Sequence, residues 1–466
     1  MSHAAEELDV EGLVEEEETE PKRKKRLGLL LGIFAGVVVL VLLVGYLVRA
    51  NADQGPDPVA VTVPIALSEV VPAENSKIGV VLTLGSGEAE GSQWHQAAQG
   101  AVVAQERIRL GGNDIELVAE DDLGTASGGV DAVDSLINQG VSGIIYASSG
   151  DHLHDGLKAA TDAGVPVILP YDTVPEGVER VWSLAPAAQD TADALAAEVA
   201  EFERPVHINA GGELPEGVDV VEELAFNAET NIDDFAEDIA LRTGANPYGN
   251  GAYTGGGEDE QTPPPVTDNP ADVVVVSGPA AMQARVVFGL QTGNVSVPVI
   301  LTDAALSPRF EQTLLELGGT VSSNLRTIGV SADDGIALGT SGKSRAMSAF
   351  LSANRQFAGD ESITNLTGDA PLAEAAAVAD TRGHDAVLAF AQALDTAGGT
   401  DPAAVAEALG GLHMVAGHGT AGPALDFSQT HAVDAVPTVL NASSQRLGLR
   451  PVHGEFSDAL VWIEQP

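Results

Sequence analysis

From residue 77 onward, the chain alternates short apolar runs with longer stretches in which apolar residues recur at helical spacing. The apolar runs are continuous, which is typical of strands that are covered on both faces. Strands of this kind, alternating with helices, predict an α/β fold with a parallel, doubly wound sheet. The predicted strands are 78–84, 115–121, 143–148 and 165–170, and the predicted helices between them are 93–108, 130–140 and 153–164.

A second series of the same kind follows. Two series predict two lobes, in agreement with a length of 466 residues, which is more than one compact core accommodates. A Gly- and Pro-rich stretch without periodicity, 244–270, predicts a long surface loop, and a helix-rich segment follows from 333 to 410. The predicted strands of the second series are 205–210, 271–278 and 297–303, and its predicted helices are 279–290 and 308–317. The helix-rich segment includes the predicted helices 383–398 and 401–411.

The N-terminal region predicts a membrane anchor. Residues 1–20 hold nine carboxylates, PKRKKR (21–26) is basic, and 27–48 is 22 residues without a charge. That length spans a hydrocarbon layer, and the basic cluster places the N-terminus in the cytoplasm. Cleavage after Ala52, as in a secretory signal, is the alternative; the long apolar run and the long acidic segment before it favour the uncleaved anchor. The folded part is then extracellular, joined to the membrane helix by a linker.

Charge and composition exclude several classes of function. The formal net charge is −46, and 59 acidic against 16 basic residues follow residue 49, so the bias belongs to the folded part. Such a surface argues against binding nucleic acid, whose phosphates require a basic footprint, and it disfavours anionic ligands at long range. The chain has no cysteine, which excludes disulfides, thiolate catalysis and cysteine-held zinc.

Several stretches follow one another in the order of a known family. These are AVDSLINQGVSGIIYASS (132–149), AGVPVILPYDT (163–173), ADVVVVSGPAA (271–281) and GHDAVLAFAQALDTAG (383–398). In this order, roughly over residues 77–440, the chain resembles the type I periplasmic solute-binding proteins, the leucine/isoleucine/valine-binding branch that feeds ABC importers. The resemblance implies two Rossmann-like lobes joined by three crossing strands, with a ligand held between the lobes when they close.

The residue patterns before residue 77 and the resemblance after it together predict a division of the chain. The tail is 1–26, the transmembrane helix 27–48 and the linker 49–76; lobe one is 77–195 with 329–426, and lobe two is 196–328 with 427–466. Two features depart from the family. The stretch 205–226 passes from strand to strand with barely room for the usual helix, so lobe two is expected to be shortened. The family's lipid-modified cysteine is missing, and the apolar span 27–48 is expected to replace it.

Ligands of open α/β sheets bind beyond the carboxyl ends of the strands. The resemblance implies that Ser149 (or the adjacent Ser148) and Thr173 hold the carboxylate of an amino acid, and that Asp303 pairs with its ammonium group. The alternatives are that the serines cap the following helix and that Asp303 caps the helix starting at Pro308. Further candidates for the wall of the cleft are Glu90, Trp94, Tyr171, Asp172 and Gly278, and Trp94 could equally belong to the core.

Other motifs do not reach the level of an active site. GSGEAEG (85–91) is close to a dinucleotide fingerprint, but its glycine spacing is off by one, and we interpret it as a turn at a sheet edge. In DHLHD (151–155) the two histidines are two residues apart and diverge on a helix, so we expect a solvated helix start rather than a metal site. The sequence has no G-x-S-x-G nucleophile elbow. We therefore predict no enzyme activity, no metal and no cofactor.

The sequence thus predicts a membrane-anchored extracytoplasmic binding protein that captures an amino acid or a similar small polar ligand, with ABC permease subunits as partners. The alternative is a ligand sensor, or a degenerate binding fold that serves as an interaction module unconnected with transport.

Overall fold

The computed structural model describes residues 64–85, 89–245, 268–321, 324–444, 447–451 and 460–464. The predicted tail, membrane helix and cleavage site lie outside these residues, as does most of the predicted loop 244–270. Residues from Val63 onward form one compact unit. In the part of the chain that the structure describes, no helix combines the length and the apolar character that a membrane crossing requires.

The first sheet is parallel throughout, with the strand order β2-β1-β3-β4-β5. Neighbouring residues of one strand enter opposite cores: Val80 packs with one buried cluster and Val81 with another. This two-sided burial is the reason that the apolar runs show no alternation. The strands are β1 (Lys77–Leu82), β2 (Glu116–Asp121), β3 (Gly143–Tyr146), β4 (Val167–Leu169) and β5 (Val181–Ser183).

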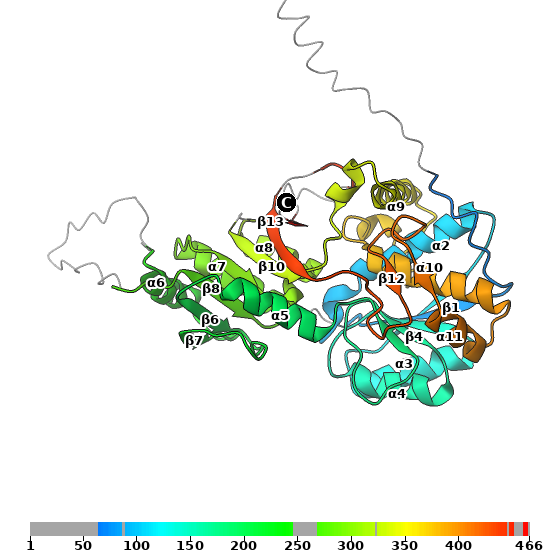
Figure 1. The fold of residues 1–466 in the computed structure, drawn as a ribbon, viewed down its shortest axis with the longest axis horizontal. Helices are drawn as coiled ribbons and strands as arrows, with labels where there is room; N and C mark the ends of the chain where they lie inside the picture. The colour runs from blue at the N-terminus through cyan, green and yellow to red at the C-terminus, as the bar shows by residue number, and fades with distance from the viewer. Residues whose placement is uncertain are drawn as a thin grey trace, which may run out of the picture. The chain divides into compact units, whose positions relative to one another are not determined.

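Helices cover both faces of this sheet, as Figure 1 shows. On one face lie α3 (Ala126–Asn138) and α4 (Leu153–Ala163), and on the other lie α2 (Gly100–Leu110), α10 (Thr381–Ala397) and α11 (Pro402–Gly410). A further helix, α9 (Gly342–Ala358), packs against the outer side of α2. We call the body built around the first sheet lobe one.

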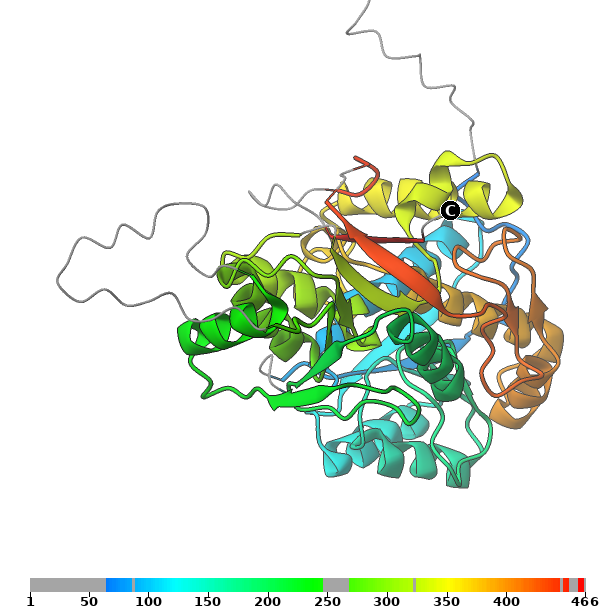
Figure 2. The same ribbon diagram turned by 60° about the vertical axis from the view of Figure 1, so that its left-hand side comes forward.

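The second sheet, which is the centre of lobe two, has the order β14-β13-β10-β9-β8-β6-β7. Its five strands from β10 to β7 are parallel, whereas β13 and β14 are antiparallel to their neighbours (Figure 2). The strands are β6 (Pro205–Asn209), β7 (Glu222–Ala225), β8 (Val273–Ser277), β9 (Val299–Leu301), β10 (Leu325–Gly329), β13 (Thr438–Ser443) and β14 (Val461–Glu464).

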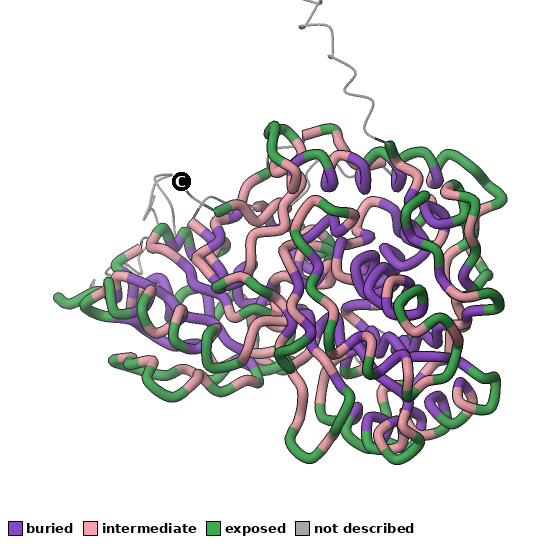
Figure 3. Tube along the Cα trace, turned by 45° about the vertical axis from the view of Figure 1, so that its right-hand side comes forward, coloured by how far each residue is buried: buried purple, intermediate pink, exposed green. Residues whose placement is uncertain are grey.

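One face of the second sheet packs against α5 (Ala188–Val199), and the other packs against α6 (Ile232–Thr243), α7 (Ala280–Thr292) and α8 (Pro308–Glu316). Figure 3 shows the resulting pattern, with buried strands inside and exposed turns of helix outside. A two-stranded sheet of β11 (His413–Met414) and β12 (Leu425–Asp426) packs on lobe one.

The expected α/β fold with parallel, doubly wound sheets is present in both lobes, and lobe two adds the antiparallel strands β13 and β14, which the sequence analysis did not predict. Between β6 and β7 the chain forms no helix, as the sequence predicts: residues 210–221 connect the two parallel strands directly. The predicted boundaries of the lobes stay a prediction.

One predicted helix, 93–108, is divided. Two 3-10 turns, η1 (Ser92–Trp94) and η2 (Ala97–Gln99), precede α2. A tertiary contact accompanies the division: the carbonyl of Ala97 accepts the N–H of Asp380 at 2.9 Å in addition to the local N–H of Gly100. Gly100 permits this approach: a Cβ atom there would lie 1.9 Å from the carbonyl oxygen of Asp380.

We expect Gly100→Ala to destabilise lobe one by about 1–3 kcal/mol, because the added methyl group forces the backbone of Asp380 away from α2. Gly399→Ala is the matched control, since a Cβ atom at Gly399 meets nothing within 4 Å. Chemical denaturation followed by circular dichroism measures both. Equal free energies of unfolding for the two variants would contradict the close packing of α2 against the start of α10.

Candidate ligand-binding site

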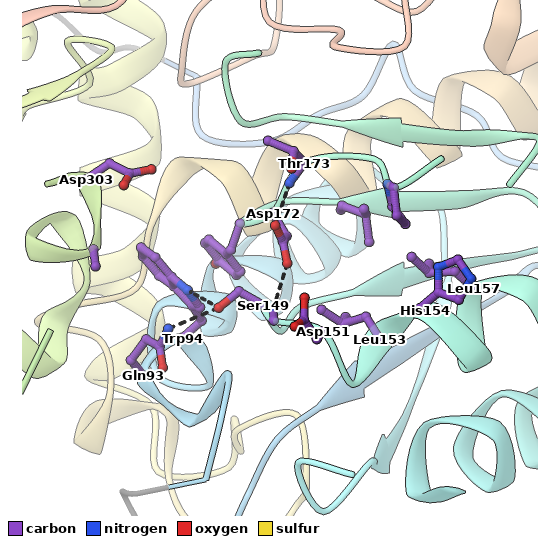
Figure 4. Close-up of a pocket in the computed structure, with 15 residues that line it drawn as sticks. Gln93, Trp94, Ser149, Asp151, Leu153, His154, Leu157, Asp172, Thr173 and Asp303 are labelled. Carbon is purple, nitrogen blue, oxygen red and sulfur yellow. Dashed lines mark hydrogen bonds between the residues drawn. The ribbon is translucent and has the colours of Figure 1, made fainter. Parts of the chain in front are cut away.

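A cavity of about 580 Å³ opens at the carboxyl ends of β3 and β4. Most of its wall comes from lobe one, and one turn of lobe two, η3 (Asp303–Leu306), closes the opposite side (Figure 4). The volume is within the range of small-molecule sites. The lining residues are Gln93, Trp94, Ser149, Gly150, Asp151, Leu153, His154, Leu157, Leu169, Tyr171, Asp172, Thr173, Pro175, Asp303 and Ala304.

The hydroxyl of Ser149 is fixed by two donors from the turn before α2. Gln93 Nε2 donates to Ser149 Oγ at 3.0 Å and Trp94 Nε1 donates at 3.1 Å, as drawn in Figure 4. Gly91 makes this approach possible, because it has a φ of 85° and a Cβ atom there would lie 1.9 Å from Ser148 Oγ. Both lone pairs of the Ser149 oxygen are therefore engaged, and the hydroxyl proton is left to donate to a ligand.

Asp172 joins the ends of the two central strands. Its carboxylate accepts the N–H of Gly150 at 2.7 Å and the N–H of Thr173 at 2.7 Å. Burial raises the pKa of Asp172, the two N–H donors oppose this, and the carboxylates of Asp303 and Glu90 add to it. The backbone N–H of Thr173 is thus bonded to a side chain of the protein.

An aromatic pair forms the floor of the cavity. The rings of Trp94 and Tyr171 stack with centroids 4.6 Å apart and planes 2° apart. The guanidinium carbon of Arg382 lies 4.8 Å from the Trp94 centroid and 4.5 Å from the Tyr171 centroid. Asp380 holds the group together, accepting the phenol of Tyr171 at 2.9 Å and Nε of Arg382 at 3.2 Å. Trp94 is therefore both a core residue and part of the cavity wall.

Asp303 faces these residues from lobe two and is accessible to solvent (Figure 4). The protein atoms enclosing the cavity raise the pKa of its carboxyl, and the nearby Arg382 cation opposes the shift. Asp303 does not cap α8, whose N-cap is Ser307; it begins the turn η3. Leu306, in the same turn, packs against the core of lobe one, so η3 is a point of contact between the lobes.

Six of the nine candidate residues, Trp94, Ser149, Tyr171, Asp172, Thr173 and Asp303, line this one cavity. The other three, Glu90, Ser148 and Gly278, do not. Neither serine caps α4, whose N-cap is His152.

Gly278 belongs to the turn after β8. Its φ is 123°, and a Cβ atom there would lie 2.5 Å from the carbonyl oxygen of Ala210. The positive φ and this close backbone contact are sufficient reasons for a glycine at position 278, and contact with a ligand is not needed to explain it.

Glu90 and Ser148 belong to a buried polar network around His152. Asp122 accepts from His152 Nε2 at 3.0 Å and Glu90 accepts from Nδ1 at 3.1 Å, while Ser148 pairs with Thr83 at 2.6 Å. The expectation of a solvated helix start at DHLHD is wrong for His152, which is only 6% exposed, and holds for His154. The sequence did not reveal the burial of His152, because its partners Asp122 and Glu90 lie 30 and 62 residues away from it in the chain.

Another buried histidine, His207 of lobe two, has a carboxylate and a serine as partners, as in a catalytic triad, but the serine is not accessible. His207 lies 3.3 Å from a carboxylate oxygen of Glu223 and 2.7 Å from Ser277 Oγ. Ser277 is 1% exposed, and its hydroxyl donates to the carbonyl of Gly212. A substrate cannot reach this oxygen, so the arrangement ties strands together. Within the described ranges, no group of His, Asp and Glu side chains could hold a metal ion.

Several residues around the cavity were not predicted from the sequence. Gln93 and Asp151 flank predicted site residues, and their position beside the strand ends could have identified them. Asp380 and Arg382 come from the start of α10, more than 200 residues from Tyr171. No local signal connects these two residues with the strand ends.

We expect His152 to titrate above its ordinary pKa of 6.5. Burial favours the neutral imidazole, but the hydrogen bonds and charges of Asp122 and Glu90 outweigh burial and raise the pKa. The contribution of His152 to the free energy of unfolding is therefore fully present below the pKa that His152 has in the unfolded chain. It is lost as pH rises through the higher pKa of His152 in the folded protein. An NMR titration of the imidazoles should show this, and Asp122→Asn should lower the value.

His207 is the internal control in the same spectrum, because burial lowers its pKa and Asp122→Asn should leave it unchanged. A His152 signal that titrates at or below the ordinary value would contradict the two-carboxylate clamp.

Comparisons with known proteins agree with this geometry. Residues 76–229 match the family model of the periplasmic binding proteins, which is a family of binding proteins and not of enzymes. No curated protein sequence matches the chain.

Solved structures share the fold of most of the chain. One is the branched-chain amino acid transporter substrate-binding protein LivJ of Streptococcus pneumoniae in complex with isoleucine, with 18% identity over 84% of this chain and 100% of that chain, at a TM-score of 0.55. Another is the leucine-binding protein LivK of Thermotoga maritima, with 18% identity over 79% of this chain and 95% of that chain, at a TM-score of 0.53.

A third is an ABC transporter substrate-binding protein of Desulfitobacterium hafniense in complex with Leu, with 17% identity over 84% of this chain and 100% of that chain, at a TM-score of 0.53. The predicted resemblance is thereby confirmed: residues 76–229 match the family model of the periplasmic binding proteins, and the two lobes share the fold of these substrate-binding proteins.

Proposed function

We propose that this protein captures an amino acid or a similar small polar solute in the cavity between its lobes, outside the cytoplasmic membrane, for delivery to an ABC importer. The observation that carries the proposal is that Ser149 and Thr173 of lobe one and Asp303 of lobe two line one cavity. The LivJ and Desulfitobacterium hafniense structures, which share the fold, hold isoleucine and leucine, and both proteins are transporter components.

Capture needs polar groups on both lobes, and the cavity has them. The Ser149 proton and the Thr173 hydroxyl are available to oxygen atoms of a solute, and Trp94 and Tyr171 offer an apolar wall. Asp303 accepts hydrogen bonds from an ammonium group, and such a charge-assisted bond is strong when water is excluded. Since Asp303 belongs to the other lobe, its bond to the solute favours the closed arrangement.

We expect a thermal-shift screen with amino acids, amines and other small polar solutes to identify a stabilising solute. A solute present at 100 times its dissociation constant adds about 2.7 kcal/mol to the free energy of unfolding. Asp303→Asn should weaken the binding of that solute at least tenfold, because it removes the charge that faces the amine.

Asp155→Asn, an exposed position on α4, is the matched control and should keep the affinity of the unchanged protein. An unaltered affinity in Asp303→Asn would exclude a charge-assisted contact from lobe two. A screen without any stabilising solute would exclude solute capture and would leave the interaction module as the better explanation.

We further propose that residues 27–48 anchor the protein in the membrane, with residues 1–26 in the cytoplasm. The support is the 22-residue uncharged run after a basic cluster. The full chain is expected to remain with membranes after alkaline carbonate washing, and a chain lacking residues 27–48 is expected to be extracted. A mature N-terminus just after Ala52 would contradict the anchor and would identify the run as a cleaved signal.

A further inference from the structure

The cavity has already used the backbone donors that a ligand carboxylate would need. At the carboxyl edge of a parallel sheet, free N–H groups are the usual partners of an anionic ligand group. Here the N–H of Gly150, after β3, and the N–H of Thr173, after β4, both donate to the carboxylate of Asp172 at 2.7 Å. The side chain of Asp172 therefore engages the two backbone donors that would otherwise be free for the carboxylate of a ligand.

The charges around the cavity point the same way. Asp151, Asp172 and Asp303 line it, and no Lys or Arg is among the described residues that do so. Arg382 lies close by, but it pairs with Asp380 at 3.2 Å and its guanidinium lies on the aromatic pair. A second carboxylate brought next to Asp172 would be repelled by like charge and would find the two N–H groups engaged.

A cation has the opposite effect. Desolvation by the surrounding protein atoms raises the pKa of both Asp172 and Asp303, so a negative charge on either carboxylate is less favourable than in water. An ammonium or guanidinium group between them relieves that cost by supplying opposite charge and hydrogen-bond donors. Each carboxylate keeps acceptor capacity for this purpose, because a carboxylate offers about four lone-pair sites and Asp172 uses two of them here.

We propose that the cavity selects cationic amines that lack a carboxylate, with Asp172 taking the place of the carboxylate of an amino acid ligand. This inference rests on the proposed function, because it names the class of solute that the same cavity captures. The solute has an ammonium or guanidinium group for Asp172 and Asp303 and an apolar portion for the wall of Trp94 and Tyr171. The cavity volume of about 580 Å³ accommodates a small amine of this kind.

The test compares amino acids with their decarboxylated amines, using the purified full chain in detergent and isothermal titration calorimetry. The pairs are leucine and 3-methylbutylamine, lysine and cadaverine, and arginine and agmatine. In every pair that binds, we expect the amine to bind at least tenfold more tightly than the amino acid.

An amino acid that binds as tightly as its amine, or more tightly, overturns this inference and leaves the proposed capture of solutes intact. Absence of binding by all six compounds overturns the inference. The thermal-shift screen with other small polar solutes then tests the proposed function separately.

Variants of Asp172 separate its charge from its hydrogen bonds. Asp172→Ala frees the N–H groups of Gly150 and Thr173, so we expect the preference within a pair to shift at least tenfold towards the amino acid. Asp172→Asn keeps the shape and an amide oxygen but loses the charge, so the amine should bind at least tenfold more weakly without a gain for the amino acid.

Asp134→Asn, an exposed position on α3, is the control and should leave both affinities unchanged. Circular dichroism of each unliganded variant confirms that it is folded before titration. If the Asp172→Ala protein is folded and still prefers the amine as the unchanged protein does, the proposal that Asp172 takes the place of a ligand carboxylate is wrong.

Discussion

The carboxylate of Asp172 connects the ends of β3 and β4, and the geometry of the cavity depends on this connection. Two strand ends that would otherwise present unpaired N–H groups are joined by one side chain at 2.7 Å on each side. Unsatisfied donors at a partly buried edge are costly, so the bridge stabilises this edge without a ligand. It also holds the two strand ends together, and Ser149 and Tyr171, which precede Gly150 and Thr173 in these strand ends, both contact Trp94.

A second connection comes from the distant part of the chain. Asp380 accepts the N–H of Gly383 at the start of α10, the phenol of Tyr171 and the guanidinium of Arg382. One carboxylate thus caps a helix, fixes an aromatic ring and neutralises the cation that lies on the aromatic pair. The close contact of Gly100 with the backbone carbonyl of Asp380 packs this residue against α2. Asp380 thus fixes Tyr171 in the floor of the cavity, and Arg382 is already paired.

Lobe two contributes less to the cavity than lobe one. Its β6 leads to β7 without a helix, and the turn after β8 is packed against Ala210 and not against the cavity. What remains is η3, which presents Asp303 and Ala304 to the cavity and places Leu306 on the core of lobe one. A single turn is enough to set the charge of that wall, because at short range one carboxylate in an enclosed space outweighs the distant surface charge.

The sequence by itself determined the alternation of strands and helices, since continuous runs such as that of β8 can be buried only between two layers of helix. It also placed Ser149, Thr173 and Asp303 at strand ends, because the carboxyl ends of parallel strands are fixed once the strands are recognised. It also predicted the short connection between β6 and β7, because 205–226 leaves barely room for the helix that is usual in the resembling family.

Tertiary structure decided what those strand ends can bind. That Asp172 accepts both edge donors, that Glu90 and Ser148 serve His152, and that Arg382 rests on Trp94 and Tyr171 all depend on contacts between residues that packing brings together. The division of the helix before α2 and the antiparallel strand β13 have the same origin. The local spacing of residues does not predict such contacts, because each contact depends on how whole helices and strands pack and not on neighbouring residues in the chain.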